Sequence, residues 1–203
     1  MLVLETSTDR LVVALVAPDG AGLAEAWEDG GRQHGRKLIP LARQVVQGFG
    51  DTVRSLGGVA VGLGPGSFTG LRIGLTAGKT LAWVNQLPLM GLDSLEALAR
   101  SAPLDEEFHR VVAVTDAQRG DVYTAEFLRE PRGSPGSWSR LRPSRMEPFE
   151  ALRATLSPGT LVVGPRLERF SGWPDFVKLV SGAQGQIRPE GLAPLVAREW
   201  SAR

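Results

Sequence analysis

Residues 59–86 carry the strongest structural signal in the sequence. Residues 59–63 form a continuous apolar run, residues 64–70 form a glycine-rich turn, and the pattern that follows is helical to about residue 86. Glycines let the chain turn tightly with backbone N–H groups pointing outward, and Ser67 or Thr69 can cap the helix. A helix N-terminus of this kind attracts phosphate or carboxylate. The segment therefore predicts a strand, an anion-attracting turn and a helix in direct succession.

Two common nucleotide-binding motifs do not fit this segment. The dinucleotide motif G-x-G-x-x-G would require glycine at Ser67 or at Thr69. The P-loop motif also fails, because residues 74–80 read GLTAGKT, which is one residue short and lies within the predicted helix. We therefore interpret Lys79 as a helix-surface residue and not as a phosphate ligand.

Small residues recur at every fourth position of the predicted helix, and they are Gly70, Gly74, Gly78 and Ala82. An interior glycine costs a helix about 0.8 to 1 kcal/mol relative to alanine, so Gly74 and Gly78 together cost roughly 2 kcal/mol. Close approach of another backbone offsets this cost, and two candidates remain open. One is the chain's own sheet, and the other is a second helix across a subunit interface. Leu71 and Leu75 lie beside the small residues and supply apolar contact area.

Strand and helix patterns alternate along the rest of the chain. We expect strands at residues 2–6, 10–17, 23–27, 88–92, 111–115, 122–128, 160–163 and 176–180. We expect helices at residues 36–47, 94–99, 148–156 and 190–202. Residues 131–137 read PRGSPGS and are expected to form a loop. The mixture predicts an α/β fold.

A weak internal repeat points to two lobes. Glu5 ends an apolar strand and is followed six positions later by a second strand, and Asp116 is followed in the same way. We place the boundary near Pro103, which gives a first lobe of residues 1–102 and a smaller second lobe of residues 103–203. The final helix is expected to pack back on the first lobe.

The polar residues 5–8 at the end of the first strand suggest a cleft between the lobes. They either face a nucleotide phosphate or form a hydrogen-bonded hairpin turn, and a Glu5–Asp116 acid/base pair is a further hypothesis. The candidate nucleotide cleft comprises Glu5, Thr6, Ser7, Gly64, Pro65, Gly66, Ser67 and Asp116.

Composition excludes several classes of chemistry. The chain has no cysteine and only two histidines, His34 and His109, so we expect no thiol nucleophile, no metal site and no cofactor.

The net charge of +1 does not indicate strong nonspecific nucleic-acid binding. Arginines at 129, 132, 140, 142 and 145 are interpreted as a solvated hairpin tip in preference to a tRNA contact. No apolar run approaches the about 18 residues of a membrane span, and the expected location is the cytoplasm.

Four segments resemble the TsaB family, formerly called YeaZ, which takes part in making threonylcarbamoyladenosine in tRNA. They are LETSTDRLVVAL at 4–15, HGRKLIPLARQVV at 34–46, GPGSFTGLRIGL at 64–75 and DAQRGDVYTAEF at 116–127. The resemblance implies a two-lobed actin-like fold of the ASKHA and RNase H-like type, with mixed sheets flanked by helices. The family usually has aspartate where this chain has Glu5.

The resemblance also implies a noncatalytic subunit without catalytic residues. The family pairs with the catalytic paralogue TsaD, and with itself when alone, through two first-lobe helices. The pair then recruits the ATPase TsaE, and tRNA is contacted only through the complex. This favours the interface explanation of the small residues. The implied contact residues are His34, Leu38, Leu41, Val45, Gly70, Leu71, Gly74, Leu75, Gly78 and Ala82.

Three functions are weighed. A scaffold and activating subunit is preferred, and a nucleotide-binding actin-like ATPase or switch is the alternative. A peptidase is the third, and it is disfavoured because the sequence offers no thiol, no metal-ligand pair and no evident Ser-His couple.

Overall fold

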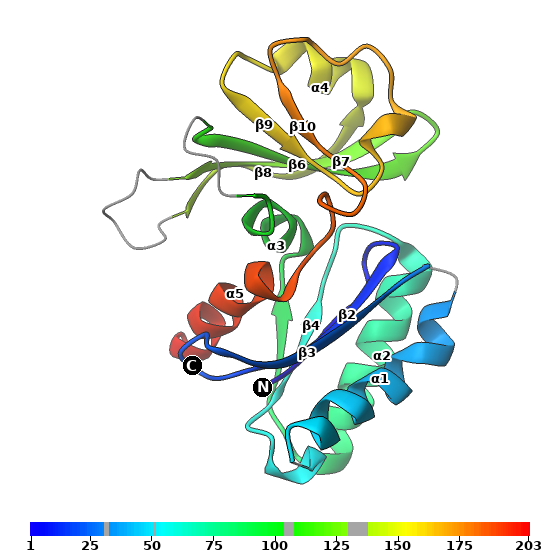
Figure 1. The fold of residues 1–203 in the computed structure, drawn as a ribbon, viewed down its shortest axis with the longest axis vertical. Coiled ribbons are helices and arrows are strands. Elements are labelled where there is room, and N and C mark those ends of the chain that lie inside the picture. The colour runs from blue at the N-terminus through cyan, green and yellow to red at the C-terminus, as the bar shows by residue number, and fades with distance from the viewer. Residues whose placement is uncertain (31–32, 51, 104–107, 130–137) are drawn as a thin grey trace.

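Both lobes of the chain are built on the same strand order (Figure 1). The computed structural model describes residues 1–30, 33–50, 52–103, 108–129 and 138–203. The first sheet has the order β3 (Gly22–Asp29), β2 (Arg10–Val16), β1 (Leu2–Glu5), β4 (Val59–Gly62), β5 (Leu89–Leu92). The second has the order β8 (Trp138–Pro148), β7 (Asp121–Arg129), β6 (Arg110–Gln118), β9 (Thr160–Val163), β10 (Lys178–Val180).

The strand directions repeat as well. In the first lobe β1 pairs antiparallel with β2 and parallel with β4, and in the second lobe β6 pairs antiparallel with β7 and parallel with β9. The hairpin repeat predicted from the sequence is therefore a repeat of the whole sheet. The expected two-lobed fold of mixed sheets flanked by helices is confirmed.

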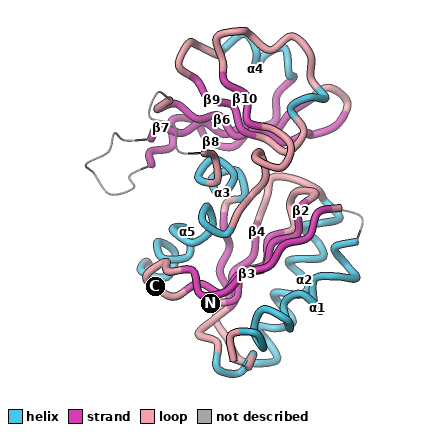
Figure 2. The backbone as a smooth tube through the Cα atoms, viewed as in Figure 1, coloured by secondary structure: helices cyan, strands magenta, loops and turns pink. Residues whose placement is uncertain are grey.

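Five α-helices flank the sheets within the described residues, and they are α1 (His34–Gly48), α2 (Phe68–Asn85), α3 (Ser94–Arg100), α4 (Phe149–Thr155) and α5 (Pro189–Ser201). Figure 2 shows α1 and α2 on one side of the first sheet, where they enclose an apolar core with β1, β2 and β4. α4 covers the outer face of the second sheet. α3 and α5 lie between the lobes and share one core with the inner faces of both sheets.

The small residues of α2 pack on the chain's own sheet. A Cβ atom added at Gly70 would lie 2.0 Å from the carbonyl oxygen of Thr6, and one at Gly74 would lie 2.3 Å from Thr6 Oγ1. A Cβ atom at Gly78 would lie 2.2 Å from Val61 Cγ1. Of the two explanations left open by the sequence, close approach of the chain's own sheet is the one that the structure shows.

The strand β8 was not expected from the sequence. Its sequence WSRLRPSRMEP contains two prolines and three arginines, and it lacks the alternation of apolar residues that identifies a strand. β8 lies at an edge of the second sheet, where proline is tolerated because one side of the strand needs no partner. The predicted loop at 131–137 lies outside the described residues.

Replacing Gly70 with alanine tests the packing of α2. We expect Gly70→Ala to destabilise the chain by about 1 to 3 kcal/mol, because the backbone of Thr6 must move to admit the new methyl group. Urea denaturation measures the change in the free energy of unfolding. Gly48→Ala, at a helical position with no other atom within 4 Å, is the control and should not destabilise the chain. Equal stability of Gly70→Ala and the wild type would contradict the packing.

Candidate functional site

A cavity of about 440 Å³ lies between the lobes, and we call it the inter-lobe cleft. Four segments of the chain form its walls. The first lobe contributes the turn between β1 and β2 and the glycine-rich turn before α2, and the second lobe contributes the β6–β7 hairpin and the segment after β9. The two repeated hairpins therefore meet at one cavity.

The glycine-rich turn joins the floor of the cleft to α2. Ser67 caps the helix, since its Oγ accepts a hydrogen bond from the Gly70 backbone N–H at 3.1 Å. The Ser67 backbone N–H in turn donates to the carbonyl oxygen of Ser7 at 2.7 Å. A Cβ atom at Gly66 would lie 2.3 Å from that same oxygen, so only glycine fits there. The predicted capping role of Ser67 is confirmed.

Glu5 lies beneath the cleft and does not line it. Its side chain is fully buried, with Oε1 accepting from the Ser7 backbone N–H at 2.6 Å and Oε2 accepting from Ser94 Oγ at 2.8 Å. Burial raises the pKa of Glu5 above its ordinary value, and the hydrogen bonds from Ser7 and Ser94 limit that rise. Glu5 therefore ties the end of β1 to the start of α3, and a Glu5–Asp116 acid/base pair in the cleft is ruled out by its position.

The predicted cleft residues divide into two groups. Those that line the cavity are Ser7, Gly66, Ser67 and Asp116. Those that the cavity does not touch are Glu5, Thr6, Gly64 and Pro65. Thr6 is buried and donates through Oγ1 to the Gly70 carbonyl oxygen, and the Gly64 N–H donates to Ser94 Oγ. The prediction rested on adjacency in sequence, but at the end of β1 the side chains of Glu5 and Thr6 turn into the core.

Charged residues at the cleft are paired. Arg166 forms an ion pair with Asp9, and Arg169 Nη1 lies 2.6 Å from Asp116 Oδ2. Asp9 and the two arginines were not predicted, because nothing in the sequence places the segment after β9 opposite the first hairpin.

Two hydroxyl groups at the cleft lack protein partners among the described residues. They are Ser7 Oγ and Thr115 Oγ1, on residues that are 2% and 7% exposed. A buried polar group without a partner is costly, so such groups mark places where a bound molecule can supply the missing hydrogen bond.

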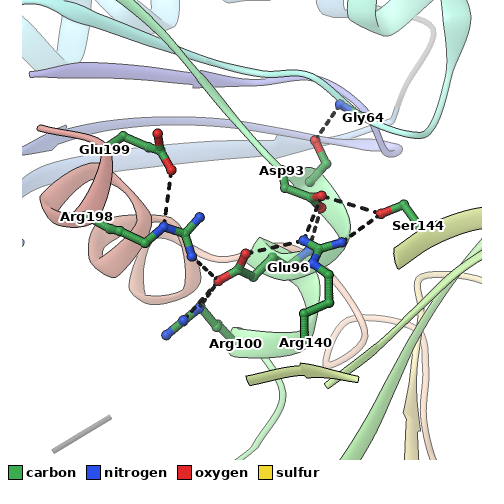
Figure 3. Close-up of polar contacts among 9 residues, drawn as sticks. Gly64, Asp93, Glu96, Arg100, Arg140, Ser144, Arg198 and Glu199 are labelled. Carbon is green, nitrogen blue, oxygen red and sulfur yellow. Dashed lines mark hydrogen bonds and ion pairs between the residues drawn. The ribbon is translucent and has the colours of Figure 1, made fainter. Parts of the chain in front are cut away.

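A polar cluster joins the lobes on the side of α3 and α5 (Figure 3). Glu96 on α3 accepts hydrogen bonds from Arg100 at 3.0 Å and from Arg198 on α5 at 2.7 Å. Arg140 on β8 reaches Asp93 at 2.8 Å and Glu96 at 3.4 Å. Burial alone would raise the pKa of Glu96, but the hydrogen bonds and charges of Arg198 and Arg100 lower it below its ordinary value.

This cluster corrects the interpretation of the arginine-rich segment as a solvated hairpin tip. Arg140, Arg142 and Arg145 lie on β8 and pair with carboxylates, Arg142 with Glu126 at 3.4 Å and Arg145 with Glu147 at 2.8 Å. Arg132 lies outside the described residues. The partners of Arg140 and Arg142 could not be predicted, because they are distant along the chain.

The outer side of α1 and α2 carries an apolar groove of about 600 Å³, which we call the α1–α2 face. Its residues are Gly35, Leu38, Ile39, Thr69, Arg72, Ile73, Thr76, Ala77, Thr80 and Leu81. Ile39 lines the groove and is 50% exposed. Trp83 on α2 is 83% exposed, and Phe68, which lines the inter-lobe cleft and contacts the groove residue Arg72, is 74% exposed.

Most of the residues expected at a subunit interface are instead part of the first-lobe interior. The buried ones are His34, Leu38, Leu41, Val45, Gly70, Gly74, Gly78 and Ala82, while Leu71 and Leu75 are half-buried. Of this set only Leu38 reaches the α1–α2 face. Both helices form as expected, but helical periodicity marks the side that packs on the sheet, and the accessible side is the opposite one.

The structure also gives the positions of His34 and Lys79. His34 is buried, with Nε2 2.8 Å from the Thr8 carbonyl oxygen. Lys79 is exposed on α2, as predicted. Within the described ranges, histidine, aspartate and glutamate do not gather in groups of three that could hold a metal ion. The described helices include none with the length and apolarity to cross a membrane.

Comparison with known proteins places this geometry in a family. Residues 28–132 match the family model described as TsaD, tRNA N6-adenosine threonylcarbamoyltransferase. The chain is 29% identical to the tRNA threonylcarbamoyladenosine biosynthesis protein TsaB of Escherichia coli (strain K12), over 98% of this chain and 82% of that protein. It is 34% identical to TsaB of Bacillus subtilis (strain 168), over 63% of this chain and about half (54%) of that protein.

A solved structure agrees over nearly the whole chain. YeaZ from Pseudomonas aeruginosa superimposes with a TM-score of 0.80 at 26% identity, covering 99% of this chain and 92% of that one. The matching sequences and the matching fold lead to one conclusion. The chain belongs to the TsaB family, formerly YeaZ, of tRNA threonylcarbamoyladenosine biosynthesis proteins.

Proposed function

We propose that the chain is a noncatalytic subunit that pairs with a TsaD homologue during threonylcarbamoylation of tRNA. The observation that carries this proposal is the division of α2 into two faces. Gly70, Gly74 and Gly78 pack on the chain's own sheet, while the opposite side presents the α1–α2 face to solvent. A helix pair held rigidly on one side and apolar on the other is suited to helix-to-helix docking.

The chemistry of the α1–α2 face supports docking of a protein. Interfaces are enriched in aromatic residues, methionine and arginine, and a few such residues supply most of the binding energy. Phe68 and Trp83 are the most exposed large apolar side chains of the described residues, and Arg72 lies 5.6 Å from the Phe68 ring centroid. A partner that covered these side chains would remove their apolar area from water and would bury few charged groups.

The arrangement of the cleft supports a noncatalytic role. A general base must be accessible to substrate, yet Glu5 lies in the core and the cleft carboxylates Asp9 and Asp116 are engaged by arginines. His34 is held in the interior by the Thr8 carbonyl oxygen. These groups hold the structure together, and the chemistry then belongs to the partner.

The remaining partners are those that the resemblance to the TsaB family implies. The chain uses the α1–α2 face for self-pairing when alone, and the pair with the TsaD homologue recruits a TsaE ATPase. Contact with tRNA is made through the complex. Gly74→Leu does not test these statements, since the added side chain would collide with Thr6 in the core.

Replacing Ile39 with aspartate tests the docking surface. We expect Ile39→Asp to weaken binding to the purified TsaD homologue by about 30-fold or more, because a central apolar contact contributes about 2 kcal/mol or more. Isothermal titration calorimetry measures the dissociation constant. The matched control is Phe176→Asp, a residue with 47% exposure on the second lobe. Unchanged binding by Ile39→Asp, or equal weakening by both variants, would reject the assignment.

A second candidate is a nucleotide-dependent switch, which the two unpartnered hydroxyls of the cleft favour. Ser7 Oγ and Thr115 Oγ1 lie beside the N-terminus of α2, whose free N–H groups attract phosphate. Calorimetry of the isolated chain with Mg-ATP distinguishes the candidates. The scaffold proposal expects no tight binding. Tight binding that Thr115→Val weakens would establish the switch.

A further inference from the structure

Ion pairs join the lobes on two opposite sides of the core that α3 and α5 share, and the two sides differ in exposure. On one side the Glu96 carboxylate is 7% exposed and receives Arg198 and Arg140. On the other side the Arg166 and Asp9 side chains, which line the inter-lobe cleft, are 48% and 37% exposed. Contact with solvent screens an ion pair strongly, while burial protects it.

The buried side is also held by packing. α3 lies between the sheets, and its apolar residues belong to a core that continues into the inner face of the second sheet. Arg140 bridges Asp93 and Glu96 from β8, and Arg198 holds Glu96 from α5 (Figure 3). Separating the lobes here would expose apolar area of the shared core and remove Arg140 from Asp93 and Glu96, while Arg100 and Arg198 would stay with Glu96.

The cleft side has no comparable support. Asp9 lies in the first-lobe turn between β1 and β2, and Arg166 lies in the second-lobe segment after β9. Between them the lobes enclose about 440 Å³, so this contact spans a cavity instead of a packed core. The neighbouring pair of Arg169 and Asp116 belongs wholly to the second lobe and does not hold the lobes together.

We propose that the Asp9–Arg166 ion pair is a salt-sensitive latch on the inter-lobe cleft. When it releases, the lobes separate at the cleft and pivot about the α3–α5 side, which stays closed. Opening exposes Ser7 and Thr115, whose hydroxyls are buried in the latched state. The latch controls access to the cleft whether the occupant is a nucleotide, an inorganic anion or solvent, so it does not depend on pairing with TsaD.

Pulsed electron paramagnetic resonance on spin-labelled chain tests the latch. Because the chain has no cysteine, Arg36→Cys on α1 and Ala151→Cys on α4 give one label on each lobe. Dilution into unlabelled protein restricts the measurement to distances within one chain. Raising the salt from about 0.01 M to about 1 M shortens the Debye length from about 30 Å to about 3 Å.

We expect high salt to increase the fraction of long distances by about 2- to 5-fold, the range for an exposed ion pair. Arg166→Gln should show this increase already at low salt. Arg169→Gln is the matched control, since it removes an arginine of the same cleft without touching the contact between the lobes, and it should leave the distances unchanged. The exchange of charges in Asp9→Arg with Arg166→Asp should restore the short distance.

Two results would overturn the latch. One is a distance distribution that neither salt nor Arg166→Gln alters. The other is an equal shift in Arg166→Gln and Arg169→Gln, which would mean that the charge of the cleft, and not the contact between the lobes, sets the distance. A stable fold of each variant is checked by its circular dichroism spectrum.

Discussion

The close approach of α2 to the first sheet determines which surfaces the chain can offer to other molecules. Gly70 and Gly74 bring the helix so near to Thr6 that no side chain fits between them. The approach fixes the glycine-rich turn against Ser7 at the floor of the cleft, and it directs Phe68, Arg72 and Trp83 outward. One helix therefore sets the position of both the cleft and the docking face.

The second constraint is the way in which polar groups join the lobes around α3. Ser94 begins the helix and donates to Glu5 beneath the cleft, while Asp93 and Glu96, on either side of it, receive Arg140 from the second lobe. A helix of seven residues thus connects the end of β1 to β8. Separation at α3 would expose the apolar core that both sheets share, whereas an exposed ion pair such as Asp9–Arg166 contributes only about 0 to 1 kcal/mol. This difference explains why we assign the pivot to α3 and the latch to the cleft.

Much of the fold could be predicted from the sequence, because it is encoded in local patterns. The apolar runs that became β1, β2, β4 and β9 and the turn that precedes α2 were placed to within a residue or two. β8 was missed, since its polar edge-strand sequence has no alternation to detect. The site was harder to predict from the sequence, because the burial of a side chain depends on which parts of the fold pack against it. Glu5 and Gly74 both stood out in the sequence, but only the structure shows that both face the core.

The proposed contact with the TsaD homologue uses the outward side of α2 and not its glycine side. Hydroxyl-radical footprinting with mass spectrometry tests it directly, comparing side-chain oxidation in the free chain and in the complex. The account predicts that Phe68 and Trp83, which are 74% and 83% exposed, react in the free chain and are protected in the complex. Phe176 on the second lobe should react equally in both. Protection of Phe176 with continued oxidation of Phe68 and Trp83 would contradict the account.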